Sequence, residues 1–396
     1  MNITILGSTG SIGVSTLDVV RRHGDRFNMF ALVAGRNVEV LLSQILDFRP
    51  AVVAVADETS LQALKNGLRA SILTPREWPE LTAGPAARVS AATAPEVDFV
   101  MSAIVGVAGL EATFQAITKK KRIGLANKEV LVASGRLVME AVRSTGAQMI
   151  PVDSEHNGAH QCLRAGLRSE VTRLILTASG GPFRETPKAD LWSVTPAQAL
   201  NHPTWKMGKR ITIDSATMMN KGFEVIEACW LFDLPSTQVD VVVHPQSSIH
   251  AMVEYTDGSL IAQISATDMR MPIQYAMTYP DRDLAPVPRL DWNQPRSWTF
   301  SPPDFDKFRL LKLAYLSQER GGSATCTLNA ADEVAVEAFL QGRIPFPAIA
   351  EIVEETLTRQ PWREPATIEE VIAIDLESRE LAGRIVDEPR PAVVTV

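Results

Sequence analysis

Short apolar runs alternate with amphipathic stretches along the first 150 residues of the chain. The runs have the length and the β-branched character of buried strands, whereas intervening segments such as residues 15–24 and 38–48 carry apolar side chains at helical spacing. The strand candidates are NITIL, NMFALVA, AVVAV, VDFVMSAI, RIGLA and AQMIPV. Strands that alternate with helices predict a parallel, doubly wound sheet. We therefore expect an α/β domain over residues 1–150.

The pattern changes twice in the rest of the chain. Residues 151–280 mix strand-like runs with a helical segment at 223–232, which predicts a central α/β domain. Prolines at 280, 286, 288, 295, 302 and 303 predict an extended linker over residues 281–304, because proline breaks helices and cannot donate to a strand ladder. Periodic apolar segments follow, so we expect a C-terminal helical domain over residues 305–396.

Composition narrows the class of protein. The net charge of −7 argues against a nucleic-acid partner, and no apolar run is long enough to span a membrane. Cys162, Cys229 and Cys326 are isolated, so they supply neither a disulfide framework nor a thiolate zinc site. The chain enters its first strand without a visible targeting segment. We expect a cytoplasmic protein with a small-molecule ligand.

A glycine-rich loop follows the first strand. Gly7, Gly10 and Gly13 stand between that strand and the first predicted helix, in the spacing G-x-x-G-x-x-G. Such a loop brings backbone N–H groups and the positive end of a helix close to a pyrophosphate. The alternative is a plain glycine-rich turn. The strand before the loop and the helix after it favour a Rossmann-type dinucleotide site.

Two later strand ends carry further candidates for the dinucleotide. Arg36, between Gly35 and Asn37, occupies the place where NAD-binding folds have an acidic residue for the ribose 2′-hydroxyl. An arginine accommodates a 2′-phosphate, which favours NADPH; the alternative is a solvated surface arginine. The triplet at residues 127–129 follows the RIGLA strand and is a candidate for holding cofactor and substrate together.

The segment PVDSEHN ends a strand in two carboxylates, Asp153 and Glu155. In extended backbone, side chains at i and i+2 point the same way, so both carboxylates would face one spot. They could form an acid/base pair, as in glycosidases, or hold a divalent cation such as Mg²⁺ or Mn²⁺. If a helix passes through TMMNKGFEVIEA, Asn220 and Glu224 are neighbours, and Glu224 could supply a third carboxylate. Lys221 and Ser215 would line the same mouth and favour an anion.

The histidines and the long irregular segment complete the candidates. His156 and His160 share a helix spacing without the H-E-x-x-H signature, so we interpret them as helix-face residues. Ser179 precedes two glycines and predicts an anion nest. Residues 179–209 contain glycine, proline and Trp205 without clear periodicity and are interpreted as a lid, with a surface loop as the alternative.

These stretches together closely resemble the 1-deoxy-D-xylulose 5-phosphate reductoisomerase family. The resemblance is carried, in family order over most of the chain, by LGSTGSIG, LANKE, PVDSEHN, TASGGPF, NHPTWKMG, TIDSATMMNKGFEVIEA, HPQSSIHAMVEYTDGS and NAADEVAVEAFL. It implies NADPH- and metal-dependent rearrangement and reduction of 1-deoxy-D-xylulose 5-phosphate to 2-C-methyl-D-erythritol 4-phosphate, a precursor in non-mevalonate isoprenoid biosynthesis. It also implies a homodimer whose interface lies in the central domain.

The resemblance implies a role for each matched residue. The metal ligands for Mg²⁺ or Mn²⁺, with Co²⁺ as a further candidate, would be Asp153, Glu155 and Glu224, which with Lys128 and His202 form the catalytic set. Ser154 and Lys128 would contact the reacting end of the substrate. The pocket for its phosphate would consist of Ser179, His202, Ser215, Asn220 and Lys221. NADPH would bind Thr9, Gly10, Ser11, Ile12, Gly35, Arg36, Asn37, Asn127, Lys128, Glu129 and Gly208. The lid residues would be Trp205 and Met207.

Two other functions stay open at this point. A different NADP-dependent two-domain dehydrogenase, such as one acting on a semialdehyde, would lack the three acids and use a cysteine or a lysine. A non-catalytic dinucleotide sensor would keep the glycine loop and Arg36 but has no need of Asp153, Glu155 and Glu224.

Overall fold

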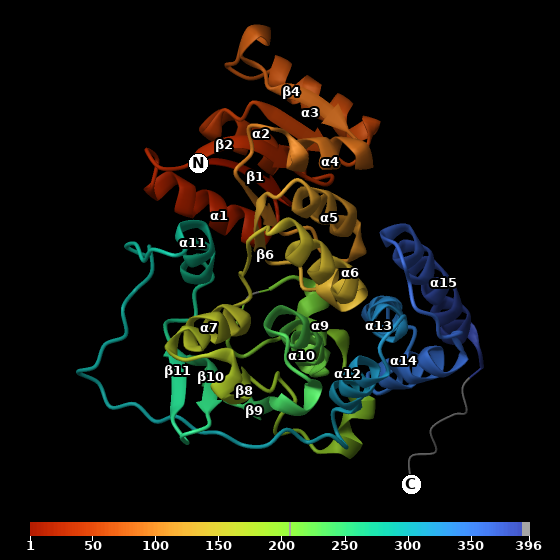
Figure 1. Ribbon diagram of the computed structural model, residues 1–396. Helices are drawn as coiled ribbons and strands as arrows, with labels where there is room; N and C mark the ends of the chain where they lie inside the picture. Colours follow the sequence, from red (N-terminus) through yellow and green to blue (C-terminus); the bar gives the residue numbers. More distant parts are fainter. Residues whose placement is uncertain (206, 390–396) are drawn as a thin grey trace. The chain divides into compact units, whose positions relative to one another are not determined.

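The six apolar runs of the N-terminal region form strands in the computed structural model, which describes residues 1–205 and 207–389 (Figure 1). A further strand, β4, completes a parallel sheet of seven strands in the order β4-β3-β2-β1-β5-β6-β7. The expectation of a parallel α/β sheet is confirmed. The strands are β1 Asn2–Leu6, β2 Asn28–Val33, β3 Val52–Val55, β4 Glu80–Ala83, β5 Phe99–Ser102, β6 Arg122–Leu125 and β7 Met149–Pro151.

The sheet is held by apolar side chains on the strands and on the helices that connect them. Ile3, Leu32 and Phe99 on the strands, and Leu41 and Leu64 on helices, are all fully buried in one apolar cluster. Burial on both faces explains why the strands are apolar runs without alternation. The helices here are α1 Ser11–Arg22, α2 Val38–Phe48, α3 Glu58–Arg69, α4 Pro85–Thr93, α5 Leu110–Thr118, α6 Glu129–Thr145, α7 Ser154–Cys162 and α11 Arg270–Thr278, with 3-10 turns η1 Pro75–Glu77, η2 Val107–Gly109, η3 Leu163–Ala165 and η4 Arg168–Glu170.

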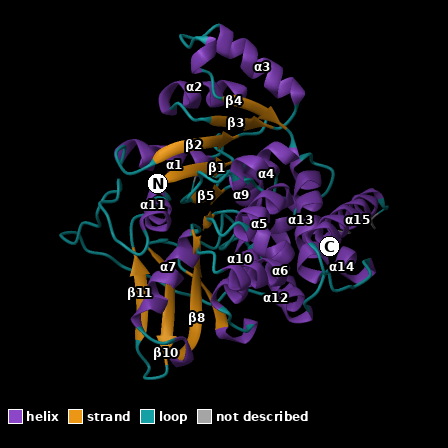
Figure 2. Ribbon diagram, turned by 45° about the horizontal axis from the view of Figure 1, so that its top comes forward, coloured by secondary structure: helices purple, strands orange, loops and turns teal. Residues whose placement is uncertain are grey.

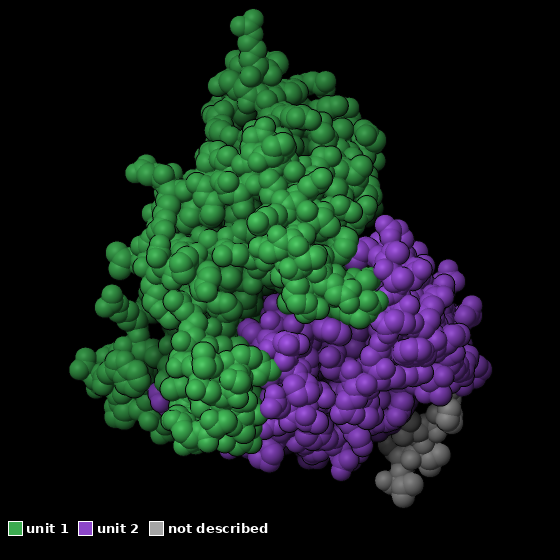
Figure 3. Space-filling view, in the orientation of Figure 1, with its two compact units in different colours: residues 1–131, 135–174, 248–297 green, residues 132–134, 175–247, 298–396 purple. Residues whose placement is uncertain are grey.

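The chain divides into two compact units, coloured separately in Figure 3. The first unit comprises residues 1–131, 135–174 and 248–297, and the second comprises residues 132–134, 175–247 and 298–396. The first unit therefore contains the parallel sheet.

A second sheet has four strands in the order β11-β10-β8-β9, drawn in orange in Figure 2. The boundary between the units falls within β8, after Leu174. In the first unit, β10 and β11 form an antiparallel hairpin whose turn contains Gly258 at a φ of 82°. Helix α7 contacts both strands of this hairpin. The bounds are β8 Val171–Ala178, β9 Val239–Val243, β10 Ile249–Tyr255 and β11 Leu260–Ile264.

The second unit is mostly helical, and α13 lies at its centre. Helix α13 contacts α9, α12, α14 and α15, and even its polar residues Asn329 and Asp332 are fully buried. Phe223, Leu328 and Phe339 belong to the apolar cluster that these helices share. The helices are α8 Pro196–Ala199, α9 Lys209–Ala216, α10 Met219–Phe232, α12 Arg309–Arg320, α13 Ala324–Leu340, α14 Ala348–Arg359 and α15 Ile368–Asp387, with 3-10 turns η5 Lys188–Ser193 and η6 Ser236–Gln238.

The proline-rich segment contains neither a helix nor a strand between α11 and α12; a single β-bridge joins Ser301 to Val243. The domain boundaries at 150, 280 and 304 stay predictions. Residues 390–396 of the predicted C-terminal domain, and Lys206 of the predicted lid, lie outside the described residues. Within residues 1–205 and 207–389, no helix has both the length and the apolar character that crossing a bilayer requires.

Candidate functional site

The glycine loop of the first unit is shaped by close backbone approaches. Gly7 has a φ of 92°, and a Cβ there would lie 2.5 Å from the carbonyl oxygen of Ala103. A Cβ on Gly13 would lie 2.4 Å from the carbonyl oxygens of both Gly7 and Ser8. Only glycine fits at these two positions. The predicted contacts Thr9, Gly10, Ser11 and Ile12 therefore lie in a fixed loop at the start of α1, with Gly10 and Ser11 exposed.

The N-terminus of α1 is free to meet a ligand. Its N-cap, Gly10, provides no side-chain cap. The first N–H groups of a helix have no intrahelical partner and carry partial positive charge, which favours a phosphate. Sequence reasoning missed Gln44 of α2, which is buried and donates from Nε2 to the carbonyl oxygen of Ser8 at 2.8 Å. Only the folded chain brings this glutamine to the loop.

The GRN triplet after β2 has two different environments. Arg36 is 85% exposed and forms an ion pair with Asp57 at 3.2 Å. Asn37 is the N-cap of α2, where its Oδ1 accepts from the Val40 N–H at 3.3 Å. Asp57 is also a helix cap, and hydrogen bonds from Ser60 hold the pKa of its carboxyl below the usual value. Arg36 is thus available at the surface, while Asn37 already has a local structural role.

Asn127, at the end of β6, fixes the loop that follows β5. It is buried, and its Nδ2 donates to the carbonyl oxygens of Ile104 and, at 3.0 Å, Gly106. Its Oδ1 is buried and has no partner among the described residues. Glu129 follows in the first turn of α6, where a carboxylate is favoured by the helix dipole. The unsatisfied Oδ1 suits a donor on a ligand.

Lys128 and Asp153 come together at adjacent strand ends. Lys128 follows β6, Asp153 follows β7, and their side chains form an ion pair that is largely shielded from solvent. Ser154 donates from Oγ to Glu155 Oε2 at 2.6 Å. The extended geometry expected for Asp153 and Glu155 is wrong, because α7 begins at Ser154 and Asp153 is its N-cap. Glu155 therefore lies in the first helical turn.

The two histidines of α7 face the protein interior. His160 Nδ1 lies 2.9 Å from the hydroxyl of Tyr275, and its ring packs edge-on against Tyr279. Burial, assisted by Arg164, lowers the pKa of His160 to about 4. His156 is fully buried. These environments fit the interpretation as helix-face residues.

In the second unit, α10 groups three of the predicted side chains. The predicted i, i+4 pair is confirmed: Asn220 Nδ2 donates to Glu224 Oε1 at 2.6 Å. Lys221 forms an ion pair with Glu224 Oε2, and both residues are buried. Glu224 is therefore the carboxylate that this helix offers as a candidate metal ligand.

Three predicted phosphate-pocket residues meet at one imidazole of the second unit. His202 Nε2 lies 3.1 Å from Ser179 Oγ and 3.1 Å from Ser215 Oγ. Its Nδ1 accepts the N–H groups of Thr204 at 3.1 Å and Trp205 at 2.9 Å. Burial, then the nearby Arg184, lower the pKa of His202. The ring is therefore neutral at pH 7 and carries its proton on Nε2.

The predicted lid is tied to this histidine. The two N–H groups that bind His202 Nδ1 fix the turn leading to Trp205. Trp205 and Met207 are both half-buried, and Gly208 is the exposed N-cap of α9. Gly181 has a φ of 65°, and a Cβ there would lie 2.6 Å from the Ser215 carbonyl oxygen. The start and end of the lid segment are thus packed close to α9.

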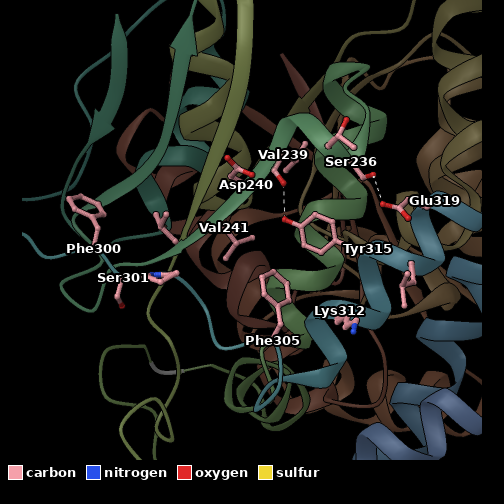
Figure 4. Close-up of a pocket in the computed structure, with 14 residues that line it drawn as sticks. Ser236, Val239, Asp240, Val241, Phe300, Ser301, Phe305, Lys312, Tyr315 and Glu319 are labelled. Carbon is pink, nitrogen blue, oxygen red and sulfur yellow. Dashed lines mark hydrogen bonds between the residues drawn. The ribbon is translucent and has the colours of Figure 1, made fainter. Parts of the chain in front are cut away.

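A cavity of 680 Å³ lies elsewhere in the second unit, between β9 and α12 (Figure 4). Its walls include Val239, Phe300 and Phe305, and the hydroxyl of Tyr315 donates to the Val239 carbonyl oxygen at 2.7 Å. Among the described residues, none of the predicted site residues lines it. The cavity is mainly apolar, although Lys312 also lines it, and it is separate from the groups around His202.

The α/β fold and these groups define a class of protein. A backbone cradle at a helix N-terminus, beside an exposed arginine, is typical of dinucleotide-binding oxidoreductases. The second unit adds a polar group of its own, with the buried Glu224 carboxylate on α10 and a neutral histidine between two serines.

Comparison with known proteins identifies the family. The sequence model described as 1-deoxy-D-xylulose 5-phosphate reductoisomerase matches residues 3–135, and models described as C-terminal domains of that reductoisomerase match residues 149–232 and 264–381. The reductoisomerase of Solibacter usitatus is 65% identical over 99% of both chains. The chain belongs to the 1-deoxy-D-xylulose 5-phosphate reductoisomerase family.

Solved structures agree along the whole chain. The reductoisomerase of Zymomonas mobilis, solved with NADPH, has a TM-score of 0.90 and 45% identity, covering 98% of this chain and 99% of that one. A reductoisomerase solved with NADPH, fosmidomycin and magnesium has a TM-score of 0.90 and 38% identity, covering 98% of both chains. The family recognised in the sequence motifs is therefore confirmed.

Proposed function

We propose that this chain converts 1-deoxy-D-xylulose 5-phosphate to 2-C-methyl-D-erythritol 4-phosphate, using NADPH and a divalent cation. The observation that carries the proposal is the 65% identity to a reductoisomerase over 99% of both chains. The residues required by the family motifs are present throughout, and the structure gives several of them chemically suitable neighbours.

The first unit fits NADPH. The loop from Gly7 to Gly13 forms a backbone cradle at a helix N-terminus that has no side-chain cap. A Cβ at Gly7 or Gly13 would fill this cradle. Arg36 is exposed and would bind the 2′-phosphate in competition with Asp57. Asn127 Oδ1 offers an unsatisfied acceptor at the carboxyl end of β6. When bound, the nicotinamide supplies hydride to the rearranged substrate.

The proposed metal ligands fit Mg²⁺ because all three are carboxylates. We propose that Asp153 and Glu155 of the first unit and Glu224 of the second share one cation. Lysines already neutralise two of these acids: Lys128 pairs with Asp153, and Lys221 pairs with Glu224. A cation at this site would compete with both lysines for the carboxylate oxygens. When bound, a divalent ion polarises a carbonyl and lowers the pKa of a coordinated hydroxyl.

The chain's own groups bind and orient the substrate. Lys128, which is buried, would donate to the oxygen that gains negative charge at the reacting carbon, assisted by the Ser154 hydroxyl. His202 holds its proton on Nε2 and shares it with Ser179 or Ser215, so the serine hydroxyls can donate to phosphate oxygens. Asn220 and Lys221 add donors. Closure of residues 179–209 over the substrate would exclude water.

The decisive experiment follows NADPH absorbance with 1-deoxy-D-xylulose 5-phosphate, before and after removal of metal by a chelator. We expect oxidation that stops on chelation and returns with Mg²⁺, Mn²⁺ or Co²⁺, together with 2-C-methyl-D-erythritol 4-phosphate as the product. Oxidation that survives chelation would favour another NADP-dependent dehydrogenase. NADPH binding without any turnover would favour the dinucleotide sensor.

The assembly and location follow the same family expectation. We propose a homodimer formed through the central domain and a cytoplasmic location. Light scattering on the purified protein should give twice the chain mass of 43.2 kDa. A monomer mass at micromolar concentration would contradict the dimer. Cell fractionation tests the location.

A further inference from the structure

The NAADE segment of α13, residues 329–333, has no role in the proposed function, although its polar side chains face the interior of the second unit. Arg210 of α9 donates to Glu333 Oε1 at 2.8 Å and to Asn329 Oδ1 at 2.9 Å. Its guanidinium also lies 3.5 Å from Asp214 Oδ2 and 3.8 Å from Asp332 Oδ2. One arginine thus connects its own helix to three polar residues of α13.

The arginine is held in a single orientation. Arg379 of α15 forms an ion pair with the other oxygen of Glu333, Oε2, at 2.8 Å, so Glu333 lies between two guanidinium groups. Asn329 Nδ2 also donates to Glu333 Oε1, at 3.2 Å. On its other side, Arg210 lies over the ring of Phe223 of α10, 5.8 Å from the centroid. A planar guanidinium can satisfy these directions together, whereas a lysine ammonium cannot.

The position of α9 matters because this helix carries part of the phosphate pocket. It has eight residues and no side-chain N-cap, so its stability depends on tertiary contacts and not on its own propensity. Ser215, next to Asp214, lies on the last turn, and its Oγ is 3.1 Å from His202 Nε2. A shift of α9 against α13 would move this hydroxyl.

We infer that Arg210 is a positioning residue for the sugar-phosphate pocket: by fixing α9 on Asn329 and Glu333 of α13, it places the Ser215 hydroxyl against His202. The inference rests on the proposed function for the identity of the ligand. On this inference, the NAADE segment holds α9, which forms one wall of the pocket. A displacement on the order of 1 Å in such a wall can cost as much as about 100-fold in activity.

The test compares Arg210→Met with Arg379→Met. Both variants remove one arginine from Glu333, but Arg210 belongs to α9, whereas Arg379 belongs to α15. We expect Arg210→Met to raise the KM for the sugar phosphate about tenfold or more. Arg379→Met should raise it less, because Arg210 keeps its hydrogen bonds to Glu333 and Asn329 in that variant. The thermal unfolding temperature should fall in both variants. A difference in KM between them therefore reports positioning and not stability. Arg210→Lys keeps the charge and should show an intermediate KM; it also serves if the methionine variant does not fold.

A double-mutant cycle with Ser215→Ala gives the sharper readout. If Arg210 acts through Ser215, Arg210→Met should raise KM much less in the Ser215→Ala background than in wild type. Fully additive effects, or equal KM changes in the Arg210 and Arg379 variants, would overturn the inference.

Calorimetric titration with inorganic phosphate separates this inference from the proposed function. Wild type should bind phosphate, and Arg210→Met should bind it about tenfold more weakly than Arg379→Met does. If wild type binds phosphate but does not turn over the sugar phosphate, the proposed function fails and this comparison still decides the role of Arg210. Equal phosphate affinity in the two variants would overturn that role.

Discussion

The dinucleotide end of the first unit and the His202 pocket of the second are built from different parts of the chain. In the loop after β1, the determining groups are mostly backbone atoms of Gly7 to Gly13, together with the backbone of Ala103. Around His202, the determining groups are side chains from separate segments, and the supporting Arg210 reaches residues 119 and 123 positions away.

The loop after β1 and the pocket around His202 should respond to mutation in opposite ways. A backbone cradle tolerates changes in side chains that point away from it but not an added Cβ inside it. A pocket made of side chains loses function when one polar atom is removed, even where the backbone does not move. Each of the following variants changes one of these features, in order of decreasing expected effect.

Glu224→Gln should have the largest effect on activity and almost none on the cradle. The amide keeps the shape and the hydrogen bond with Asn220 but removes a charge from the proposed metal site. We expect kcat to fall at least about 1000-fold, the scale of losing several kcal/mol of charge stabilisation. NADPH affinity, measured by fluorescence titration, should stay within about twofold. Glu337→Gln, the same change at an exposed position of α13, is the control; an active Glu224 variant would remove this residue from the metal site.

Gly13→Ala should damage the cradle itself. The new Cβ would lie 2.4 Å from two carbonyl oxygens, so the backbone must shift, at a cost of about 3 kcal/mol. Both the free energy of unfolding and NADPH affinity should fall. Gly35→Ala is the matched control, because its Cβ would have no neighbour within 4 Å and should leave the free energy of unfolding nearly unchanged. Equal destabilisation by both variants would mean that the close approach at Gly13 is unimportant.

Arg36→Asp tests the side chain proposed to bind the 2′-phosphate of NADPH. Reversing the charge should weaken NADPH roughly 10- to 100-fold, because a charge-assisted hydrogen bond to the 2′-phosphate is lost and a repulsion is added. NADH lacks that phosphate, so its affinity should change no more than about threefold. Titration with both nucleotides measures the ratio. Equal losses for the two would place the 2′-phosphate away from Arg36.

The same contrast explains what the sequence could predict. Glycine spacing, strand runs and the i, i+4 pair at Asn220 and Glu224 are local patterns, and the structure contains them. Strand β4 was missed because its four residues, ELTA, alternate polar with apolar at the sheet edge and form no apolar run. The extended interpretation of Asp153 and Glu155 failed because the helix begins one residue earlier than that pattern needs. The Arg210 contacts join helices distant in sequence, and no local pattern indicates them.

Asp332 should show the smallest effect, and it concerns stability alone. Burial, then the neighbouring Asp214, raise the pKa of Asp332 well above its usual value, so folding favours the protonated form of this carboxyl. The contribution of Asp332 to the free energy of unfolding is therefore most favourable below its unfolded pKa of about 3.9, and it falls as pH rises toward the folded pKa. Asp332→Asn has no proton to lose. Urea unfolding should show the variant gaining on wild type by on the order of 1 kcal/mol between pH 5 and pH 8.

The control for this pH effect is Asp387→Asn, whose carboxylate lies on the surface of α15. It should follow wild type at both pH values, because an exposed pair contributes little. A contrary result would be an Asp332→Asn variant that loses stability at pH 8, since this would mean that Asp332 is ionised and pairs with Arg210. In that case the buried cluster of the second unit would depend on an ion pair between Asp332 and Arg210. The expected result instead requires one acid of the Asp214 and Asp332 pair to stay neutral while α9 packs on α13.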